Sequence, residues 1–290
     1  MAIGRSTEVA GVQPDYSGQE FSEQDVANGE HRKFVGGSWD THGKTQLHYL
    51  QSRGLKPEHR LLDIGCGAFR AGRHFIDYLE PGHYFGIEAN PTLIQTGYDR
   101  ELSDEQRDKA PEDNFRITDR FWSKFGATKF DYALAQSVFT HISLNHIRLC
   151  LHRTAQVVKP GGHFYATFFE RPDDTSLGKV FNQGGNRPFF TEKNAFWYYR
   201  GDLEWAASYA PWKMNYIGDW GHPAKQMMIE FVRMGPGEEM RWRQRRAAQI
   251  DGVPDEPSVR SSLQRLQSDL ADLSRVSRSW VAEKIASSRS

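Results

Sequence analysis

Short apolar runs alternate with amphipathic segments from about residue 59 to residue 170. The apolar runs are bounded by charged residues, glycine or proline. They predict strands at residues 59–65, 83–90, 114–119, 130–137 and 163–170. The segments between them carry apolar residues at helical spacing and predict helices at residues 71–82, 91–102 and 143–158. Strands that alternate with helices of this length are typical of βαβ units, so we expect a mostly parallel sheet.

The pattern changes after the fifth predicted strand. Residues 171–188 are rich in Gly, Asn, Asp and Pro and predict a long loop. A helix is predicted at residues 201–210, and two further strands at residues 212–220 and 225–234 are separated by the turn sequence GHP. This spacing predicts an antiparallel hairpin at the edge of the sheet.

Two further segments flank this alternating region. Residues 41–54 predict a helix that buries Leu47 and Leu50 and ends at Gly54, whereas residues 1–28 have little apolar periodicity and are expected to form a mobile arm. Near the other end, apolar residues recur at alternating spacings of three and four, which predicts an amphipathic helix of heptad character. These residues are Val259, Leu263, Leu266, Leu270, Leu273 and Trp280.

The pattern therefore predicts three parts of the chain. We expect the arm at residues 1–28, the main domain at residues 29–235, and a linker with the C-terminal helix at residues 236–290. The C-terminal helix can pair with a second copy to form a homodimer, or lie across the main domain. The heptad pattern leaves both arrangements open.

Composition and charge narrow the possible partners. Lys and Arg number 37 and Asp and Glu number 37, so the net charge is zero. Because proteins that bind nucleic acid or anionic membranes normally carry a basic surplus, we expect neither partner. Cys66 and Cys150 have no CxxC spacing, which argues against a disulfide framework or a zinc site. No apolar run is long enough to span a bilayer and residues 1–30 lack a leader pattern, so a cytoplasmic protein is expected.

The sequence LLDIGCGAFRAG, at residues 61–72, ends the first predicted strand and opens the following helix. Gly65 and Gly67 allow the backbone to approach a ligand closely, and the helix N-terminus offers unpaired amides. Glu88 ends the next strand, where an acid is suited to bind ribose hydroxyls. A dinucleotide fingerprint would place a third glycine where this chain has Arg70, so a nucleoside ligand without a pyrophosphate is favoured. The alternative is a tight turn without a ligand.

The motifs LLDIGCGAFRAG, FGIEAN, FDYALAQSVFTHI and VVKPGG stand in one order along the chain. In this order, residues 34–235 resemble a class I S-adenosylmethionine-dependent methyltransferase. The resemblance implies an α/β fold with a Rossmann-like seven-stranded sheet, mostly parallel, with an antiparallel final hairpin. It also implies S-adenosyl-L-methionine as the cofactor.

The cofactor residues implied by the resemblance lie in the glycine loop and at the ends of strands. They are Asp63, Gly65, Cys66, Gly67, Glu88, Ala89, Asn90, Asp119, Gln136 and Ser137. Glu88 would bind the ribose hydroxyls, Ala89 and Asn90 would flank the adenine, and Asp119 would accept from the adenine amino group. We add Arg70 as a partner for the carboxylate of the cofactor.

Methyl transfer from a sulfonium mainly requires alignment of donor and acceptor, and a hydroxyl acceptor also benefits from a general base. His141, which follows the fourth strand in SVFTHI, is the predicted base; a structural or cofactor-contacting role is the alternative. Glu170, at the end of the fifth strand, is a second candidate for substrate binding or base catalysis. His222 lies in the turn of the predicted final hairpin, where a simple turn role is expected; the alternative is that this turn overhangs the pocket. Paired acids in the loop at residues 173–174 are interpreted as solvated, so no metal site is predicted.

Taken together, the motifs favour a methyltransferase that acts on a small molecule, with a hydroxyl oxygen of a sugar or specialised metabolite as the acceptor. Methylation of RNA or protein is an alternative, but the neutral charge and the lack of an NPPY-like motif after the fourth strand disfavour it. A third possibility is a non-catalytic scaffold that binds the cofactor and uses the C-terminal helix to contact other molecules.

Overall fold

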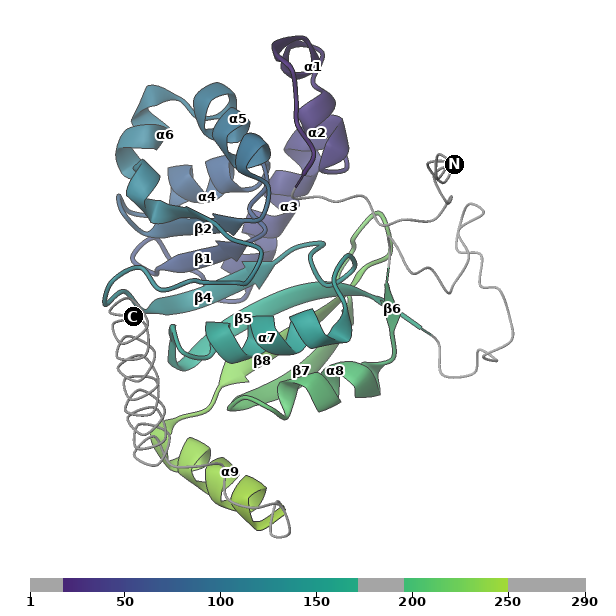
Figure 1. The fold of residues 1–290 in the computed structure, drawn as a ribbon. Coiled ribbons are helices and arrows are strands. Elements are labelled where there is room, and N and C mark those ends of the chain that lie inside the picture. The colour runs from purple at the N-terminus through teal and green to yellow at the C-terminus, as the bar shows by residue number, and fades with distance from the viewer. Residues whose placement is uncertain (1–17, 172–195, 250–290) are drawn as a thin grey trace, which may run out of the picture. The chain divides into compact units, whose positions relative to one another are not determined.

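The structure is a computed structural model that describes residues 18–171 and 196–249 (Figure 1). The chain divides into two units, Met1–Glu239 and Met240–Ser290. The predicted heptad helix lies outside the described residues, so the homodimer remains a prediction. Within the described residues, no helix combines the length and the apolar character that crossing a bilayer requires.

Helices and strands alternate from β1 to β5 as the sequence pattern predicts, and the last helix crosses the boundary between the two units. The helices are α1 (Glu23–Ala27), α2 (Glu30–Phe34), α3 (Trp39–Ser52), α4 (Gly72–Tyr78), α5 (Pro91–Glu101), α6 (Asp104–Lys109), the short 3-10 helix η1 (Glu112–Asn114), α7 (Leu144–Thr154), α8 (Arg200–Ala207) and α9 (Pro236–Gln249). The strands are β1 (Leu61–Ile64), β2 (Tyr84–Glu88), β3 (Phe115–Ile117), β4 (Phe130–Ala135), β5 (Val158–Glu170), β6 (Trp197–Tyr198), β7 (Trp212–Asp219) and β8 (Met227–Arg233).

The strands form one sheet in the order β3-β2-β1-β4-β5-β8-β7, with β6 paired to the end of β5. The strands β3, β2, β1, β4 and β5 are parallel to their neighbours, whereas β8 runs antiparallel to both β5 and β7. This arrangement confirms the predicted Rossmann-like sheet with an antiparallel final hairpin. Helix α7 begins at the start of the helix predicted for residues 143–158, and Ser143 caps it by accepting from the backbone N–H of His146.

The sheet is covered by helices on both faces, and strand residues alternate between the two layers (Figure 1). Leu62 and Ile64 of β1 pack in the layer that contains α7 and α8. Leu61 packs in the layer that contains α3, α4 and α5, and the predicted core residue Leu50 of α3 is fully buried there. This alternation decides which strand-end side chains share a face with the functional site.

Short helices occur where the sequence pattern is weak. α1 lies within residues 1–28, the range expected to be a mobile arm, and it begins with a capping box in which Ser22 and Asp25 bond reciprocally. α6 follows α5 directly, in a segment without a predicted element, and is capped in the same way by Ser103 and Gln106. Helices this short carry too few apolar positions for periodicity to reveal them.

The sequence KPGG lies ahead of the predicted fifth strand at residues 163–170, but the structure includes it in β5. Phe130 of β4 pairs with Val158, and Tyr132 pairs with His163, so the extra residues of β5 interrupt the register. Gly161 has a φ of 80°, which a glycine adopts without strain. The residues KPGG therefore form an irregularity of the bulge type inside the long strand β5.

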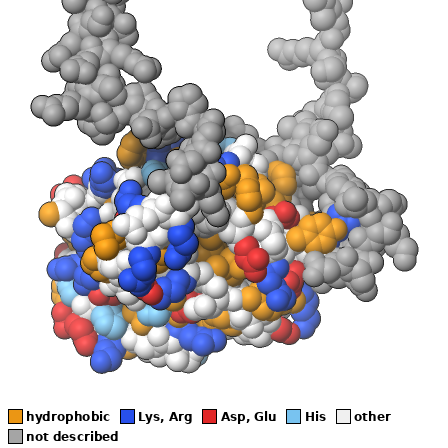
Figure 2. Space-filling view, turned by 90° about the horizontal axis from the view of Figure 1, so that it is seen from below, with side chains coloured by type: hydrophobic (Ala, Val, Ile, Leu, Met, Phe, Trp, Pro, Cys, Tyr) orange, Lys and Arg blue, Asp and Glu red, His pale blue; other side chains and the backbone are white. Residues whose placement is uncertain are grey.

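The surface mixes charges of both signs. Figure 2 shows one face on which Lys and Arg side chains lie among Asp, Glu and hydrophobic side chains. This distribution agrees with the balanced composition of the chain. A long uninterrupted basic field does not occur on the face shown.

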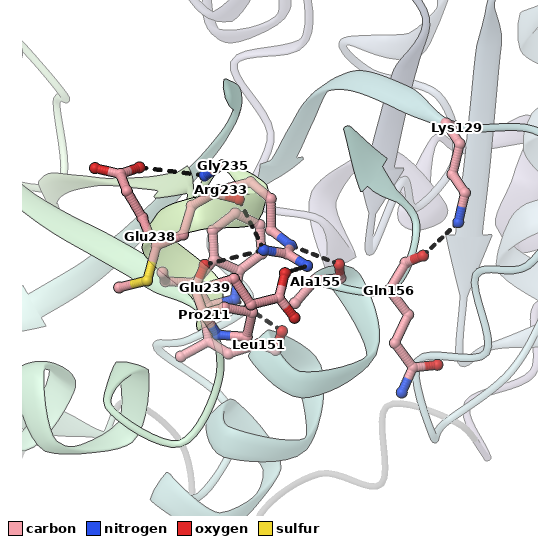
Figure 3. A network of polar contacts seen from close by, with 11 residues as sticks. Lys129, Leu151, Ala155, Gln156, Pro211, Arg233, Gly235, Glu238 and Glu239 are labelled. Carbon is pink, nitrogen blue, oxygen red and sulfur yellow. Dashed lines mark hydrogen bonds and ion pairs between the residues drawn. The ribbon is translucent and has the colours of Figure 1, made fainter. Parts of the chain in front are cut away.

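A network of hydrogen bonds and an ion pair surrounds Arg233 at the end of β8 (Figure 3). The guanidinium of Arg233 donates from Nε to the carbonyl of Ala155 at the C-terminus of α7, at 2.8 Å, and from Nη1 to Met234 O at 3.0 Å. Nη2 forms an ion pair with Glu239 Oε2 at 2.6 Å, and both side chains are largely buried. A cation at a helix C-terminus also interacts favourably with the helix dipole. Arg233 therefore joins α7, β8 and the start of α9.

We expect Arg233→Met to lower the free energy of unfolding by about 2–3 kcal/mol, because it leaves a buried carboxylate and buried carbonyls without their donor. Urea denaturation of the purified protein measures this change. Arg100→Met is the matched control, since Arg100 is an exposed residue of α5. Equal stability of the two variants would contradict the role assigned to Arg233.

Candidate functional site

The strand order reverses between β1 and β4, because the chain proceeds from β1 to β2 and β3 on one side and to β4 and β5 on the other. In open α/β sheets, ligands bind outside the carboxyl ends of the strands at such a point. The alternation of strand side chains places Asp63, Glu88, Gln136 and Thr167 at this edge, on the face that carries α3, α4 and α5. The structure thus brings most predicted residues together at one edge.

The carboxylate of Glu88, at the end of β2, accepts three hydrogen bonds from backbone amides. Its Oε2 accepts from the backbone N–H of Gly67 at 2.9 Å, and its Oε1 accepts from the amides of Ala89 at 2.9 Å and Asn90 at 3.0 Å. Burial raises the pKa of the carboxyl group, and these amides oppose the shift by stabilising the charged form. A carboxylate offers about four lone-pair sites, so one remains for a ligand hydroxyl.

Asp63, at the end of β1, is a buried acid with a strongly altered affinity for protons. Its Oδ2 accepts from the hydroxyl of Tyr84 at 2.7 Å. The pKa of Asp63 is raised to about 7, because burial and the charge of Glu88 together outweigh the lowering by the Tyr84 hydrogen bond and by the charge of Arg70. Tyr84 was not predicted as a site residue, although a tyrosine in a buried strand next to a strand-end acid is a detectable signal.

The two glycines of the loop adopt backbone conformations that other residues avoid. Gly65 has a φ of 73° and Gly67 a φ of 57°, both in the left-handed region. A Cβ atom on Gly65 would lie 2.6 Å from Val138 Cγ2, in the segment after β4, and one on Gly67 would lie 3.3 Å from Val35 Cγ1. Cys66 between them is buried and free, and burial raises the pKa of its thiol. The loop is therefore tightly packed by its neighbours.

Arg70 and Asn90 connect this edge to the segment that precedes α3. Nη1 of Arg70 donates to Val35 O at 2.6 Å and to Gly37 O at 3.2 Å. Asn90 caps α5 through Leu93 N, and its Nδ2 donates to Gln19 O at 2.8 Å. Both predicted residues thus also hold the N-terminal segment against the site, which adds to the cofactor roles expected for them.

The end of β4 carries a second group of polar side chains. Gln226 Oε1 accepts from Thr167 Oγ1 at 2.6 Å, from Ser137 Oγ at 3.1 Å and from Gln136 Nε2 at 3.4 Å. Gln136 Oε1 is buried without a hydrogen-bond partner. Ser137 has a φ of 59°, and its amide donates to Thr167 Oγ1 at 2.7 Å. Thr167 and Gln226 were not predicted as site residues; polar residues that alternate with core residues near strand ends are the signal for both.

The two predicted acid–base residues lie beyond the ends of β4 and β5. His141 is partly buried in the turn after β4, where its amide donates to Val138 O at 2.9 Å. Glu170 accepts from the hydroxyl of Tyr216 and forms an ion pair with Arg200 at 3.3 Å. Both oxygens of Glu170 are thus engaged, which favours a structural role at the end of β5. The chain segment that contains Asp173 and Asp174 lies outside the described residues.

Asp119 was predicted to bind the cofactor, but it does not lie with the other predicted cofactor residues. Its side chain is 72% exposed, next to Arg120 Nε at 3.9 Å. No three His, Cys, Asp or Glu side chains within residues 18–171 and 196–249 are placed to hold a metal ion together. The polar groups at the site are two buried carboxylates, neutral amides and hydroxyls. This set fits a nucleoside cofactor, because the carboxylate of Glu88 suits ribose hydroxyls and Gln136 Oε1 still lacks a donor.

Comparison with known sequences also finds methyltransferases. Residues 62–164 match the family model described as "Methyltransferase domain". A curated relative, the ubiquinone/menaquinone biosynthesis C-methyltransferase UbiE of Ectopseudomonas mendocina, is 25% identical over 134 residues, which are 46% of this chain and 50% of the relative. The chain therefore aligns with about half the length of this relative.

Solved structures with a similar fold are methyltransferases as well. The sugar N-methyltransferase KedS8 from Streptoalloteichus sp. has a TM-score of 0.52 and 17% identity, covering 81% of this chain and 99% of its own. Human N-acetylserotonin methyltransferase, solved with S-adenosylmethionine, has a TM-score of 0.51 and 15% identity, covering 73% of this chain and 58% of its own. At these identities the likeness concerns the fold. The matched residues and the topology of the sheet together show a Rossmann-like methyltransferase fold.

Proposed function

We propose that the protein transfers a methyl group from S-adenosyl-L-methionine to a hydroxyl oxygen of a small molecule, such as a sugar or a specialised metabolite. The observation that carries the cofactor assignment is the buried carboxylate of Glu88, which organises the amides of Gly67, Ala89 and Asn90 and retains capacity for a ribose hydroxyl. This carboxylate lies beside the glycine loop at the reversal of strand order.

The cofactor supplies a methyl group on a positively charged sulfur. The residues of this chain contribute binding and alignment: Glu88 holds the ribose, and Gln136 and Ser137 fix the end of β4 through Gln226. Asp63 adds a carboxyl group on the same face. Effective alignment of two reactants accounts for much of the rate acceleration in transfers of this kind.

The polar groups around the β4 end support a neutral acceptor. Gln136, Ser137, Thr167 and Gln226 offer amides and hydroxyls, which suit a hydroxylated molecule better than a cation. His141 is the base that would remove the proton from the acceptor hydroxyl, since both oxygens of Glu170 already have partners. The similar proteins include a sugar N-methyltransferase and a ubiquinone/menaquinone biosynthesis C-methyltransferase, so oxygen as the acceptor atom is our proposal for this chain.

The mixed charges seen in Figure 2 support a small-molecule acceptor over nucleic acid, because phosphate contacts favour a basic field. A cytoplasmic location and the absence of nucleic-acid and membrane partners stay predictions from composition. Methylation of a protein is the remaining alternative among methyl acceptors.

The proposal is tested with methyl-labelled S-adenosylmethionine and a panel of nucleotide-activated sugars, phenols and amines. We expect acceptor-dependent formation of S-adenosylhomocysteine, and carbon NMR of the product should place the label on oxygen. His141→Ala is expected to lower kcat by about 10²- to 10⁴-fold, the usual contribution of a general base. His146→Ala is the control, because His146 is exposed at the start of α7 and pairs with Ser143. Label on nitrogen or carbon, or full turnover by His141→Ala, contradicts the proposal.

A further inference from the structure

A chain of hydrogen bonds leads from the backbone amide of Ser137 to the side chain of Gln136. The amide of Ser137 donates to Thr167 Oγ1 at 2.7 Å, and Thr167 Oγ1 donates to Gln226 Oε1 at 2.6 Å. Gln226 Oε1 also accepts from Gln136 Nε2 at 3.4 Å. Thr167 is fully buried, and only 5% of Gln226 and 9% of Gln136 are exposed. These bonds join the end of β4 to β5 and to the residue before β8.

The backbone amide sets the direction of the bonds that follow it, because a backbone N–H can only donate. Thr167 accepts from this amide with a lone pair and donates its single proton to Gln226. The separation of 2.6 Å between Thr167 and Gln226 is typical of an O–H···O bond and shorter than is usual for N–H···O. The amide oxygen of Gln226 therefore faces Thr167, and the amide NH₂ group of Gln136 faces that oxygen.

Gln136 consequently presents an acceptor on its other side. Its Nε2 is directed to Ser137 Oγ at 3.3 Å and to Gln226 Oε1. Its Oε1 is buried, and no donor reaches it from the part of the chain that the structure describes. Buried acceptors without a donor are uncommon, and this one lies at the edge of the sheet where ligands bind. The site therefore favours a ligand group that carries an N–H or O–H, since a group with lone pairs alone leaves the acceptor unpaired.

The number of protons on the methyl acceptor indicates which group this is. A hydroxyl carries one proton, and the proposed function assigns the proton of the reacting hydroxyl to His141. His141 lies in the turn that follows Gln136 and the end of β4. The hydrogen bond to Gln136 Oε1 must then come from a second group of the same molecule. A hydroxyl on the neighbouring carbon is the group of this kind that lies nearest to the reacting oxygen.

Resting on the proposed function, we propose that the methyl acceptor is a diol, in which one hydroxyl is methylated and the hydroxyl on the neighbouring carbon donates to Gln136 Oε1. Pyranose sugars and catechols belong to this class. Gln226 is the positioning residue, because its oxygen fixes the orientation of the Gln136 amide.

The second hydroxyl takes no part in the bonds that change. The reacting oxygen forms a bond to the methyl carbon, the bond between that carbon and sulfur breaks with its electron pair remaining on sulfur, and the proton of the reacting hydroxyl goes to His141. The second hydroxyl keeps its proton, so its hydrogen bond to Gln136 persists from substrate to product. Gln136 thus selects and aligns the acceptor without exchanging a proton with it.

Initial rates with matched acceptors test this assignment. The pairs are catechol with phenol, and a nucleotide-activated hexose with its monodeoxy analogues. We expect the wild-type kcat/KM to be about 10- to 100-fold higher for the diol of an accepted pair, because the analogue leaves one buried acceptor unpaired. Gln136→Leu should lose most of this preference. Calorimetry should show that this variant binds S-adenosylhomocysteine as tightly as the wild type.

Two substitutions isolate the role of Gln226. Gln226→Glu keeps an oxygen that accepts from Thr167 and Gln136, so it should retain the preference for the diol. Gln226→Leu removes that oxygen and allows the Gln136 amide to turn, so it should lose most of the preference. Gln95→Leu is the matched control, since Gln95 is exposed on α5. The ratio of two kcat/KM values does not depend on the fraction of active protein, so partial loss of fold does not imitate the expected result.

The outcomes separate this inference from the proposed function. If the wild type methylates no oxygen, the proposed function fails and the inference fails with it. If the wild type methylates oxygen and treats the diol and its deoxy analogue alike, the inference alone is overturned. Weaker binding of S-adenosylhomocysteine by Gln136→Leu would assign the donor to the cofactor and also overturn it. An undiminished preference in Gln226→Leu would overturn the positioning role.

Discussion

Replacing Glu88 by alanine is expected to weaken the binding of S-adenosylhomocysteine by about 100-fold or more. The carboxylate is the acceptor assigned to the ribose hydroxyls, and hydrogen bonds to a charged group contribute about 1.5–3 kcal/mol each. The substitution also leaves the amides of Gly67, Ala89 and Asn90 without their acceptor, so the glycine loop loses its fixed position. Loss of the ligand contact and loss of loop order act in the same direction.

Calorimetry of Glu88→Ala, Glu88→Gln and the control Glu105→Ala measures this effect. Glu105 is exposed on α6 and should be neutral. Glu88→Gln keeps an acceptor oxygen without the charge, so its affinity should fall between those of the wild type and the alanine variant. Undiminished binding by Glu88→Ala would show that the ribose site lies elsewhere on the protein.

Replacing Asp63 by asparagine is expected to stabilise the ligand-free protein at neutral and alkaline pH. Burial raises the pKa of Asp63 in the folded protein to about 7, whereas the pKa of an unperturbed aspartate is 3.8. The folded state therefore holds this proton more tightly, and ionisation of Asp63 favours the unfolded state. This penalty is absent below pH 3.8, grows as the pH rises to about 7 and then stays constant. Asparagine avoids the penalty and can still accept from the hydroxyl of Tyr84.

Denaturant titrations of the wild type and of Asp63→Asn at pH 5 and pH 8 test this expectation. The stability difference in favour of the variant should increase by on the order of 2 kcal/mol between the two pH values. Asp77→Asn serves as a control, because Asp77 is an exposed residue of α4. A stability difference that does not depend on pH would show that Asp63 titrates normally in the folded protein. We expect the same variant to bind the cationic S-adenosylmethionine more weakly, so stability and function oppose each other at this position.

The order of the main strands and helices could be predicted from apolar periodicity, because β1, β2, β4 and β5 bury most of their side chains. Strand-end residues of the site, such as Asp63 and Glu88, followed from the same pattern, since the end of an apolar run marks the end of a strand. The short helices α1 and α6 were not predictable in this way. Their stability comes from capping residues and from contacts with other segments, and local periodicity does not report either.

The partners of the site residues could not be predicted from their neighbours in the chain. Gln226 follows Ser137 by 89 residues and reaches it because β8 lies next to β5 in the sheet. His42 and His222 are also far apart in the chain. Their rings stack because α3 and the β7–β8 turn meet at one edge of the sheet. Each of these residues alone resembles an ordinary surface or core residue.

The amino-acid sequence by itself therefore determined the βαβ order, the antiparallel final hairpin, the glycine loop and the acids at the ends of β1 and β2. Local patterns encode these features, because periodicity, glycine placement and strand ends depend on a few consecutive residues. Tertiary structure alone decided which distant side chains complete the site, and how burial changes their protonation. Desolvation and hydrogen bonding between remote segments exist only after the chain has folded, and for this reason Asp63, Gln136 and Gln226 acquire their roles there.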